Sequence, residues 1–321
     1  MGYCNNFRVC KSKVILNSVF ISPSSVILAF MIAIYGKTFS KNNAPFAQEL
    51  FDYMNQKGMK YVVEEKFLQL MKNEMQLRIT ADTFTSFSDI KNQTEVVFSM
   101  GGAGTILDAV VMIKESEIPI LGINFGRLGF LASLGRDQIR AAVDSVEKGA
   151  YMTDRRSIIE LQSNKPLFED NFALNDMTIQ RRDQSSMITV NAYLNGELLN
   201  TYWADGLIVA TPTGSTGYSL SCGGPILYPT SGNFVITPVA PHNLNVRPMV
   251  VSDEVVLSFE VTGRGDSFLC TLDARHKAID SSYQLAIKKA SFQANIIRLT
   301  DQSFLTALKT KLNWGSDHRN Y

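Results

Sequence analysis

Short apolar runs alternate with helical patterns between residues 31 and 150. Four segments have the compact, apolar character of buried strands: Ile32–Tyr35, Lys60–Val63, Glu95–Met100 and Pro119–Ile123. Four others carry apolar residues at helical spacing, the first with Asn43 as its candidate cap: Pro45–Met54, Glu65–Met75, Ile106–Ile113 and Asp137–Glu147. Strands that alternate with helices predict a mainly parallel sheet with helices on its faces.

From about residue 151 the helical periodicity thins and short strands separated by turns take over. The strand-like segments are Ser157–Gln162, Met187–Leu194, Gly206–Ala210, Val255–Val261 and Phe268–Leu272. Asn195-Gly196 follows one of these runs, and this dipeptide strongly indicates a hairpin. We therefore expect an α/β nucleotide-binding domain over residues 31–150 and a β-rich domain over 151–295. A helical pattern at Ser303–Leu312 predicts that the final segment, 296–321, packs back on the first domain.

Residues 1–30 differ in character from the rest of the chain. Arg8, Lys11 and Lys13 precede an apolar stretch, residues 14–30, in an arrangement similar to a signal peptide or anchor. Asn, Ser and Pro residues interrupt that stretch, and it is short for a membrane span. We expect these residues to be an extension outside the fold, with Met31 as an alternative start of translation.

Composition and charge narrow the possible functions. A net charge of +1 over 321 residues gives no basic excess that would indicate nucleic acid. Four widely spaced cysteines without a CxxC pair indicate reduced thiols in a cytoplasmic protein, for which we expect no membrane association. Three histidines without HExxH or zinc-type spacing identify no metal site.

A glycine-rich turn, Gly101-Gly102-Ala103-Gly104-Thr105, joins a predicted strand to a predicted helix. Glycines let backbone N–H groups approach a ligand closely, and a helix N-terminus favours negative charge. A pyrophosphate group is therefore the expected ligand, although many tight turns are rich in glycine. The chain contains neither GxGxxG at this turn nor the P-loop pattern GxxxxGK[ST], so ordinary Rossmann and P-loop proteins are disfavoured.

Two shorter motifs follow the glycine turn. Residues 122–131, Gly-Ile-Asn-Phe-Gly-Arg-Leu-Gly-Phe-Leu, begin where the next predicted strand ends, which is the edge at which open parallel sheets bind ligands. A structural loop that needs three glycines is the equal alternative. The pair Asn175-Asp176 can hold ribose hydroxyls because its side chains both donate and accept hydrogen bonds. Taken alone, that pair is more simply explained by an Asx turn.

The longest motif covers residues 204–221 and continues into Gly223-Gly224-Pro225. Its glycines and small hydroxyl residues offer many short donors and acceptors, and Tyr218 adds a face on which a base can stack. Backbone groups buried over such a length need partners, which favours contact with a ligand. Beyond it, Pro238 and Pro241 stiffen the chain before His242, where a substrate contact competes with a structural role.

Taken in order, these five segments resemble the NAD kinase family, and its bacterial members most of all. The family carries Gly-Gly-Asp-Gly-Thr, Gly-Ile-Asn with Leu-Gly-Phe-Leu, Asn-Glu or Asn-Asp, Asp-Gly with Thr-Pro-Thr-Gly-Ser-Thr-Ala-Tyr-Ser, and Pro-His. The resemblance covers about residues 31–310 and is most specific in the Thr/Gly/Ser segment. It implies a Rossmann-like α/β domain followed by a β-sandwich domain, with the site between them.

The same resemblance implies an activity and its partners. The family phosphorylates the 2′-hydroxyl of the adenosine ribose of NAD to give NADP, with ATP as the phosphoryl donor. A divalent metal, Mg²⁺, and assembly as a homodimer or homotetramer are further expectations.

Roles of single residues are carried over by position. Ala103 and Gly104 lie where the family's turn meets NAD, Asn175 and Asp176 would hold the ribose and adenine region, and Asp205 would contact the nicotinamide end. Six residues would line the adenine and ribose pocket: Thr216, Gly217, Tyr218, Ser219, Leu220 and Ser221. Phe125 and His242 are further candidates for contact with the substrate.

Two positions depart from the family pattern. Ala103 stands where the family has an aspartate, its proposed general base, and a methyl group can neither accept a proton nor bind a metal. Because general base catalysis contributes about 10²–10⁴-fold, we expect activity reduced by that order with NAD binding kept. Asp108, one helical turn later, is expected to point elsewhere. Gly217 replaces a common alanine, and we expect little effect.

Two other hypotheses stay open. A protein that binds NAD or NADP without catalysis, as a sensor or an inactive paralogue, is favoured by Ala103. A lipid or sugar kinase with a similar glycine turn is disfavoured by residues 213–216, Thr-Gly-Ser-Thr.

Overall fold

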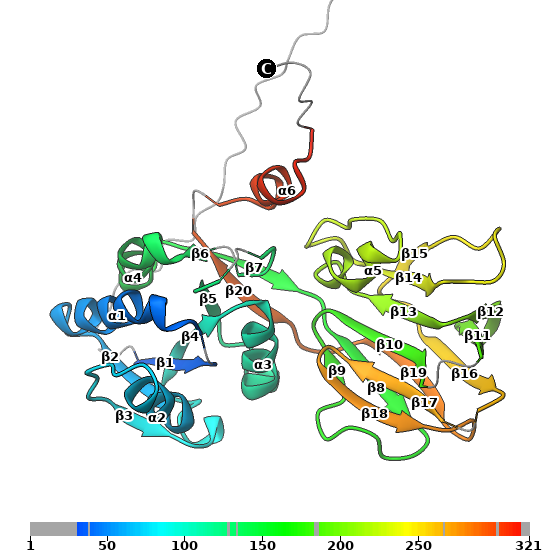
Figure 1. The fold of residues 1–321 in the computed structure, drawn as a ribbon, viewed down its shortest axis with the longest axis horizontal. Helices are drawn as coiled ribbons and strands as arrows, with labels where there is room; N and C mark the ends of the chain where they lie inside the picture. The colour runs from blue at the N-terminus through cyan, green and yellow to red at the C-terminus, as the bar shows by residue number, and fades with distance from the viewer. Residues whose placement is uncertain are drawn as a thin grey trace, which may run out of the picture.

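The computed structural model describes residues 31–37, 39–126, 129–132, 134–182, 186–265, 267–299 and 302–315. The expected extension, residues 1–30, lies outside the described residues, as do Arg127 and Leu128 of the second motif. The described chain forms an α/β lobe and a β lobe side by side, with helix α6 (Phe304–Leu312) above their junction (Figure 1).

An eight-stranded sheet organises the α/β lobe. Its order is β3-β2-β1-β4-β5-β20-β7, with β6 paired to β5. The strands are β1 (Met31–Gly36), β2 (Lys60–Glu64), β3 (Asp82–Phe84), β4 (Thr94–Gly101), β5 (Ile120–Asn124), β6 (Leu134–Gly135), β7 (Met152–Arg156) and β20 (Ala294–Arg298). All neighbours pair in parallel except β7, which runs antiparallel to β20. Segments from both halves of the chain therefore complete this sheet.

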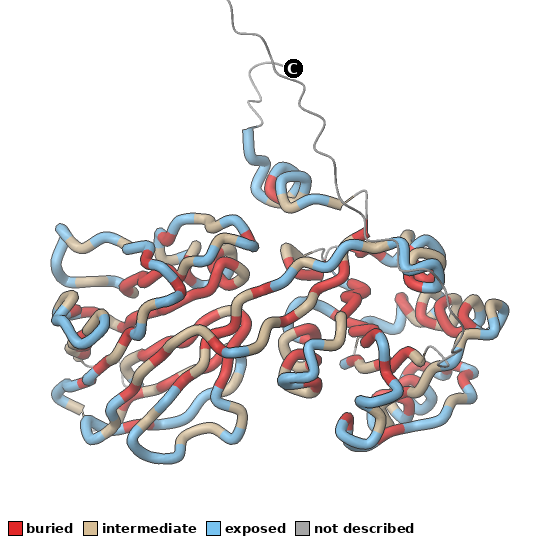
Figure 2. Tube along the Cα trace, turned by 180° about the vertical axis from the view of Figure 1, so that it is seen from behind, coloured by how far each residue is buried: buried red, intermediate tan, exposed pale blue. Residues whose placement is uncertain are grey.

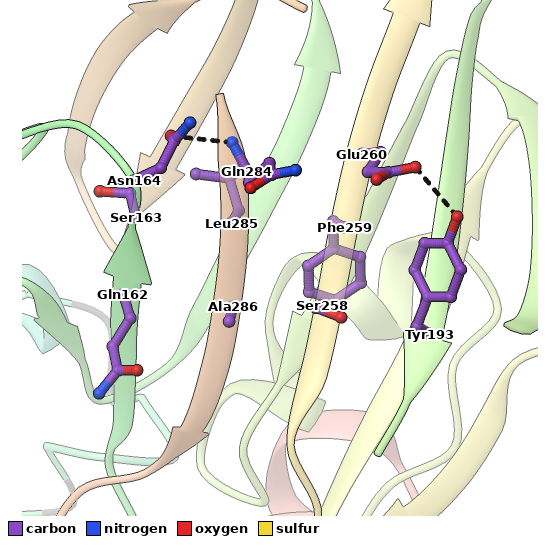
Figure 3. A pocket seen from close by; sticks show the side chains of 10 residues that line it. All are labelled: Gln162, Ser163, Asn164, Tyr193, Ser258, Phe259, Glu260, Gln284, Leu285 and Ala286. Carbon is purple, nitrogen blue, oxygen red and sulfur yellow. Dashed lines mark hydrogen bonds between the residues drawn. The ribbon is translucent and has the colours of Figure 1, made fainter. Parts of the chain in front are cut away.

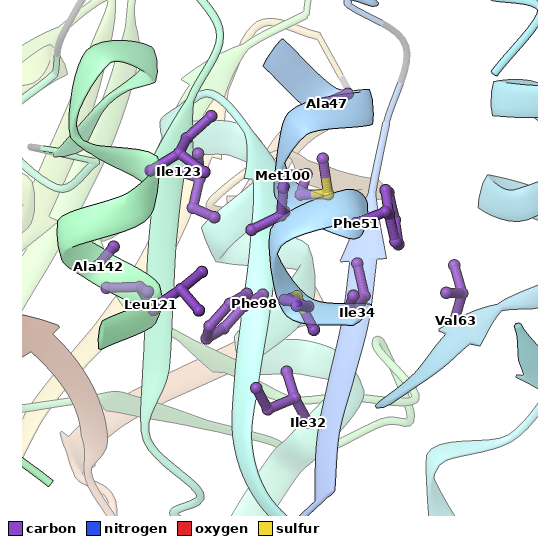
Figure 4. Close-up of a cluster of buried hydrophobic side chains, with 14 of the residues drawn as sticks. Ile32, Ile34, Ala47, Phe51, Val63, Phe98, Met100, Leu121, Ile123 and Ala142 are labelled. Carbon is purple, nitrogen blue, oxygen red and sulfur yellow. The ribbon is translucent and has the colours of Figure 1, made fainter. Parts of the chain in front are cut away.

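Four helices cover the two faces of the sheet. They are α1 (Ala44–Gln56), α2 (Glu65–Asn73), α3 (Ala103–Ile113) and α4 (Ile139–Glu147). The apolar sides of α1, α2 and α4 share one core with Phe98 and Met100 of β4, as Figure 4 shows for part of this cluster. Among the described residues, no helix has the length and apolar character needed to cross a bilayer.

The expected cap of α1 is wrong in its chemistry. Asn43 occupies the N-cap position, but its side chain caps no backbone N–H. Its amide instead donates to the Phe125 carbonyl, and its oxygen accepts from Arg136 at 2.8 Å. The side chain thus connects three segments that are distant in sequence, a use that helix-cap rules do not predict.

The β lobe consists of two six-stranded antiparallel sheets. One has the order β15-β14-β13-β10-β17-β18 and the other β12-β11-β16-β19-β8-β9. The strands are β8 (Ile159–Ser163), β9 (Phe172–Ala173), β10 (Asp176–Arg181), β11 (Ile188–Leu194), β12 (Glu197–Ala204), β13 (Gly206–Ala210), β14 (Asn233–Val239), β15 (Met249–Ser252), β16 (Leu257–Gly263), β17 (Phe268–Leu272), β18 (Arg275–Ile279) and β19 (Gln284–Lys289).

A second core fills the β lobe, and side chains from both of its sheets contribute to it. The hairpin predicted at Asn195-Gly196 joins β11 to β12, and both residues have positive φ. Figure 2 shows that buried segments concentrate in the strands of both lobes. A mainly parallel α/β sheet followed by an antiparallel β-sandwich confirms the predicted fold class.

A third core joins the lobes. The buried side of α3, including Ile106 and Val110, packs with Ile158, Phe172 and Leu174 at the edge of the β lobe. Apolar burial of this kind is the main favourable term in association. It brings the glycine turn, which immediately precedes α3, close to the start of β10.

Phe98 is fully buried at the centre of the first core. Phe98→Ala should lower the free energy of unfolding by about 3–5 kcal/mol, because it removes a large apolar side chain and leaves a cavity. Urea denaturation measures the change. Leu305→Ala, at a position of α6 that is 59% exposed, is the control and should stay within about 0.5 kcal/mol. Equal effects of the two substitutions would contradict the described core.

Candidate active site

The glycine turn lies at the switch point of the α/β sheet. β1 and β4 are neighbours, and from them the sheet extends toward β2 and β3 on one side and toward β5 on the other. In open α/β sheets, ligands bind outside the carboxyl ends of the strands at such a point. Gly101 ends β4, and a β-carbon there would overlap Thr105, so only glycine lets the chain turn directly into α3.

Ala103 is the first residue of α3 and is exposed. The N–H groups in the first turn of a helix have no intrahelical acceptor, and the helix dipole makes this end positive. Asp108 lies further along α3, where its carboxylate pairs with Lys37 at 2.5 Å. The carboxylate of Asp108 is therefore already engaged away from Ala103.

A cavity of about 150 Å³ lies between the lobes beside Ala103. The described residues that line it come from seven separate stretches of the chain: Ala103, Phe130, Leu131, Arg156, Asn175, Pro212, Thr213, Thr216, Gly217, Pro229 and Phe304. Four of the candidates from the sequence thus meet at one place, namely Ala103, Asn175, Thr216 and Gly217. We refer to this space as the interlobe cavity.

The backbone around Asn175 is fixed from one side by Asp273. The carboxylate of Asp273 accepts the N–H groups of Leu174 at 2.9 Å, Asn175 at 2.7 Å and Asp176 at 3.3 Å. Burial raises the pKa of Asp273, and these three N–H donors together with the charge of Arg275 oppose that rise by favouring the carboxylate form. Arg275 donates to the carbonyls of Asp170 and Phe172, so the segment that leads into β10 is held along its length.

The long Thr/Gly/Ser motif holds the same backbone from the other side. The Thr211 N–H donates to the Asn175 carbonyl at 2.9 Å, and its hydroxyl donates to the Leu174 carbonyl. Gly214 then packs so closely against Asn175 that a β-carbon on Gly214 would overlap the carbonyl oxygen of Asn175. The third and fourth motifs therefore form one hydrogen-bonded unit.

Asp176 does not line the interlobe cavity. Its buried carboxyl group accepts a hydrogen bond from the Thr178 hydroxyl at 3.3 Å. Burial, and then the charge of Asp273, raises the pKa of Asp176 to about 7. A perturbed carboxyl group next to a cavity is typical of functional sites, although structural networks produce such shifts as well.

The later residues of the long motif lie beyond the cavity lining. Tyr218 begins the short helix α5 (Tyr218–Ser221), and its hydroxyl accepts a hydrogen bond from the Gln180 amide at 2.8 Å. The Ser219 hydroxyl is buried and lies 2.8 Å from that of Thr237. Asp205 pairs with Arg181 at 3.1 Å. Leu220 is partly buried, and Ser221 and Gly104 are exposed.

Phe125 and His242 also lie outside the cavity lining. Phe125 is buried, and its ring stacks on Phe39 with centroids 4.5 Å apart. His242 is exposed and lies against the Trp203 ring with centroids 4.7 Å apart. Both side chains therefore have a packing role in this structure.

The described residues do not fit a Mg²⁺ ion held by the protein. No cluster of three or more His, Cys, Asp or Glu side chains occurs among them. The described lining of the interlobe cavity also contains no carboxylate, which is the ligand that Mg²⁺ prefers in proteins.

A larger hollow of about 470 Å³ lies on the sheet that contains β8, β19, β16 and β11 (Figure 3). Tyr193 donates to Glu260 at 2.9 Å across it, and the Gln284 N–H donates to Asn164 at 3.0 Å. None of the described residues that line it is a lysine or arginine, and none belongs to the five motifs. It offers little to a phosphate group.

The sequence patterns do not point to Arg156, Pro229 and Phe304 in the cavity lining, nor to Asp273 behind it. Arg156 ends a short strand, and nothing in its neighbourhood distinguishes it from a surface arginine. Asp273 gives one signal, because Asp is among the residues that tolerate the positive φ found in its turn between β17 and β18. That signal indicates a turn, but it does not indicate that Asp273 binds the backbone of residues 174–176.

A glycine turn at a sheet switch point faces a β-sandwich across a cavity whose described lining has no carboxylate. This arrangement defines a two-lobed α/β protein with an anion-compatible site. Comparison with known proteins specifies the family. Residues 30–151 match the ATP-NAD kinase N-terminal domain, and residues 174–299 match the ATP-NAD kinase C-terminal domain. The chain therefore belongs to the ATP-NAD kinase family.

Curated relatives match almost end to end. The chain is 44% identical to the NAD kinase of Cytophaga hutchinsonii over 292 residues, which are 90% of this chain and 100% of that protein. It is 43% identical to the NAD kinase of Flavobacterium psychrophilum, over 90% of this chain and 99% of that one.

Two solved structures share the fold. A yeast NADH kinase complexed with NADH has a TM-score of 0.81 at 21% identity, covering 91% of this chain and 90% of that one. An NAD kinase from Archaeoglobus fulgidus in complex with ATP has a TM-score of 0.67 at 24% identity, covering 88% and 99%.

Gly214→Ala tests the contact between the two motifs. The added β-carbon must displace the Asn175 backbone, so the free energy of unfolding should fall by about 1–3 kcal/mol. Urea denaturation measures the change. Gly104→Ala is the matched control, because its β-carbon meets no neighbour and lies in a helix, where alanine stabilises by up to about 1 kcal/mol. If Gly104→Ala lowers the stability and Gly214→Ala does not, the described contact between Gly214 and Asn175 is contradicted.

Asp176→Asn tests the buried carboxyl group. With a pKa of about 7 against 3.8 for the ordinary side chain, the folded protein keeps a proton that the unfolded chain releases. The free energy of unfolding should therefore decrease as pH rises through this interval. The neutral amide should remove this part of the pH dependence and raise stability at pH 8 by about 1–3 kcal/mol.

Urea denaturation between pH 4.5 and 8 measures this effect. Asp82→Asn, at an exposed position of β3, is the control and should keep the pH dependence of the parent. If Asp176→Asn also keeps it, Asp176 is not the group responsible.

Proposed function

We propose that this chain phosphorylates the 2′-hydroxyl of the adenosine ribose of NAD to give NADP, with ATP as the phosphoryl donor. The carrying observation is the interlobe cavity, where Ala103, Asn175, Thr216 and Gly217 meet although they come from three motifs. Family membership over both lobes and relatives named NAD kinase support the same reaction.

Within this proposal, the cavity holds the ribose of NAD beside the N-terminus of α3. The Asn175 amide and the Thr216 hydroxyl provide short polar contacts, and the clamped backbone keeps them in place. Orientation of the reacting groups supplies much of the rate in phosphoryl transfer. Gly104 and Asp176 would support this region from outside the cavity lining.

The rest of NAD would extend along the β lobe. Residues 216–221 would take the adenine side, with the exposed ring of Tyr218 as a stacking face. Asp205 would meet the nicotinamide end, for which its ion pair with Arg181 must open or be shared. Phe125 and His242 stay further candidates for contact with the substrate, beside the packing roles described above.

The finer organisation follows the same proposal. Residues 31–150 would form the nucleotide-binding domain and 151–295 the β domain, with 296–321 packing back on the first. Within 151–295, β7 and the first residues of β20 nevertheless complete the sheet of the α/β lobe. Support comes from β20, which pairs in the first sheet, and from Phe304, whose ring centroid lies 6.0 Å from that of Phe130.

Assembly and compartment are parts of the proposal too. Exposed apolar side chains at Trp203, Leu244 and Met249 support a homodimer or homotetramer. The free thiols of Cys222 and Cys270 support a cytoplasmic location.

One observation favours a second candidate, a protein that binds NAD or NADP without catalysis. No Asp or Glu is found among the described residues that line the interlobe cavity, and Asp108 is paired with Lys37. Among the described lining residues, no carboxylate is therefore available to take the proton of the 2′-hydroxyl as a general base. We propose that Ala103 makes this chain a slow kinase that still binds NAD.

The test is Ala103→Asp. An aspartate in the first turn of α3 is favoured by the helix dipole and has room at an exposed position, so the variant should fold. It would add a carboxylate to a cavity whose described lining has none. The rate of NADP formation from NAD, ATP and Mg²⁺ should rise by about 10²-fold or more.

Ala103→Asn is the matched control, because its amide is similar in size but cannot act as a base, and its rate should stay near that of the parent. If the aspartate variant is no faster than the parent, the lack of a general base at position 103 does not limit the rate. If neither protein binds NAD, the proposed function fails.

A further inference from the structure

Arg156 is the single charged side chain among the described residues that line the interlobe cavity. The other lining groups are apolar, amide, hydroxyl or backbone. A small cavity whose described lining holds one cationic group and no anionic group favours an anion as its occupant.

The guanidinium of Arg156 is deeply buried and has few partners that neutralise or hydrogen-bond it. The residue is only 6% exposed, and burial lowers the pKa of its guanidinium. Nη2 donates to Asp154 at 3.1 Å, and Nη1 lies 3.4 Å from the Thr213 hydroxyl. Within the part of the chain that the structure describes, Nε has no hydrogen-bond partner. Buried charge without full pairing is costly, so such a group is expected to serve a ligand.

The one carboxylate beside Arg156 is shared. Asp154 also accepts from Nε of Arg298 at 3.4 Å, so two guanidinium groups meet a single aspartate. Ala103, at the N-terminus of α3, also lines the cavity, and this helix end adds partial positive charge. The local field therefore has two positive sources.

Size and shape limit the anion. About 150 Å³ is well below the roughly 300–1,000 Å³ of pockets that enclose whole ligands, so the cavity takes part of a ligand. The planar fork of a guanidinium matches the oxygens of a phosphate group. Hydroxyls of Thr213 and Thr216 and the amide of Asn175 add hydrogen bonds suited to phosphate and sugar oxygens.

We propose that Arg156 binds the phosphoryl group that the reaction transfers, at the point where it joins the ribose 2′-oxygen. This inference rests on the proposed function and deepens it by naming the group that neutralises the charge. The phosphoryl group arrives on ATP and leaves on NADP, and binding measurements separate the two sources: NADP differs from NAD by the 2′-phosphate alone, whereas ADP reports the donor side.

The experiment compares dissociation constants of NAD, NADP and ADP by calorimetry for the purified full chain and three variants. Arg156→Gln removes the charge, and Arg156→Lys keeps it without the fork. Arg298→Gln is the matched control, since it removes the other guanidinium on Asp154 without touching the interlobe cavity. The dissociation constant for NAD also shows whether each variant keeps its fold.

Arg156→Gln should weaken NADP binding by at least about tenfold, with NAD binding within about threefold of the parent. Arg156→Lys should fall between the parent and Arg156→Gln, and Arg298→Gln should leave the ratio of the NADP and NAD constants unchanged. Selective loss of ADP binding in place of NADP overturns the inference, because ADP lacks the phosphoryl group that is transferred and carries only the two phosphates that remain on the donor.

Equal weakening of all three nucleotides, or no change in any, overturns the inference, because a structural arginine gives that result. The same holds if Arg298→Gln reproduces the selectivity of Arg156→Gln. If the parent binds NAD and forms NADP while these outcomes are found, only the role of Arg156 is lost. A parent that binds neither NAD nor NADP contradicts the proposed function as well.

Discussion

The site depends on one set of hydrogen bonds, in which the Asp273 carboxylate accepts three consecutive backbone N–H groups at residues 174–176. A carboxylate can satisfy so many donors only if the chain around it is fixed, and here Thr211 fixes the other side of the same backbone. The result is a rigid platform at the start of β10. Asn175 projects from that platform into the interlobe cavity.

The packing of α3 brings the glycine turn to this platform. The apolar side of this helix is buried between the α/β sheet and the edge of the β lobe, so the glycine turn before it cannot move away from Asn175. A parallel sheet leaves its switch point open for a ligand, and a sandwich alone has no helix N-terminus to offer. Each lobe therefore supplies what the other lacks.

Ionisable side chains that are costly to bury lie around this junction. Asp176 is buried with a raised pKa, and Arg156 is buried with Nε unpaired among the residues that the structure describes. Neither helps the fold by itself, since apolar residues of similar size would avoid the desolvation. Stability is thus lower here than packing alone would allow, which is the usual relation between a polar site and the scaffold that carries it.

The sequence by itself determined the elements and the fold class, because strand alternation, helical spacing and turn residues such as Asn195-Gly196 act over a few neighbours. It also pointed to the glycine turn and to residues 204–221. Only the tertiary structure decided which candidates face the cavity. Neighbouring residues at the start of a strand point to opposite faces, so Asn175 lines the cavity and Asp176 does not. Arg156 and Asp273 enter through contacts across 57 and 98 residues, which no local pattern encodes.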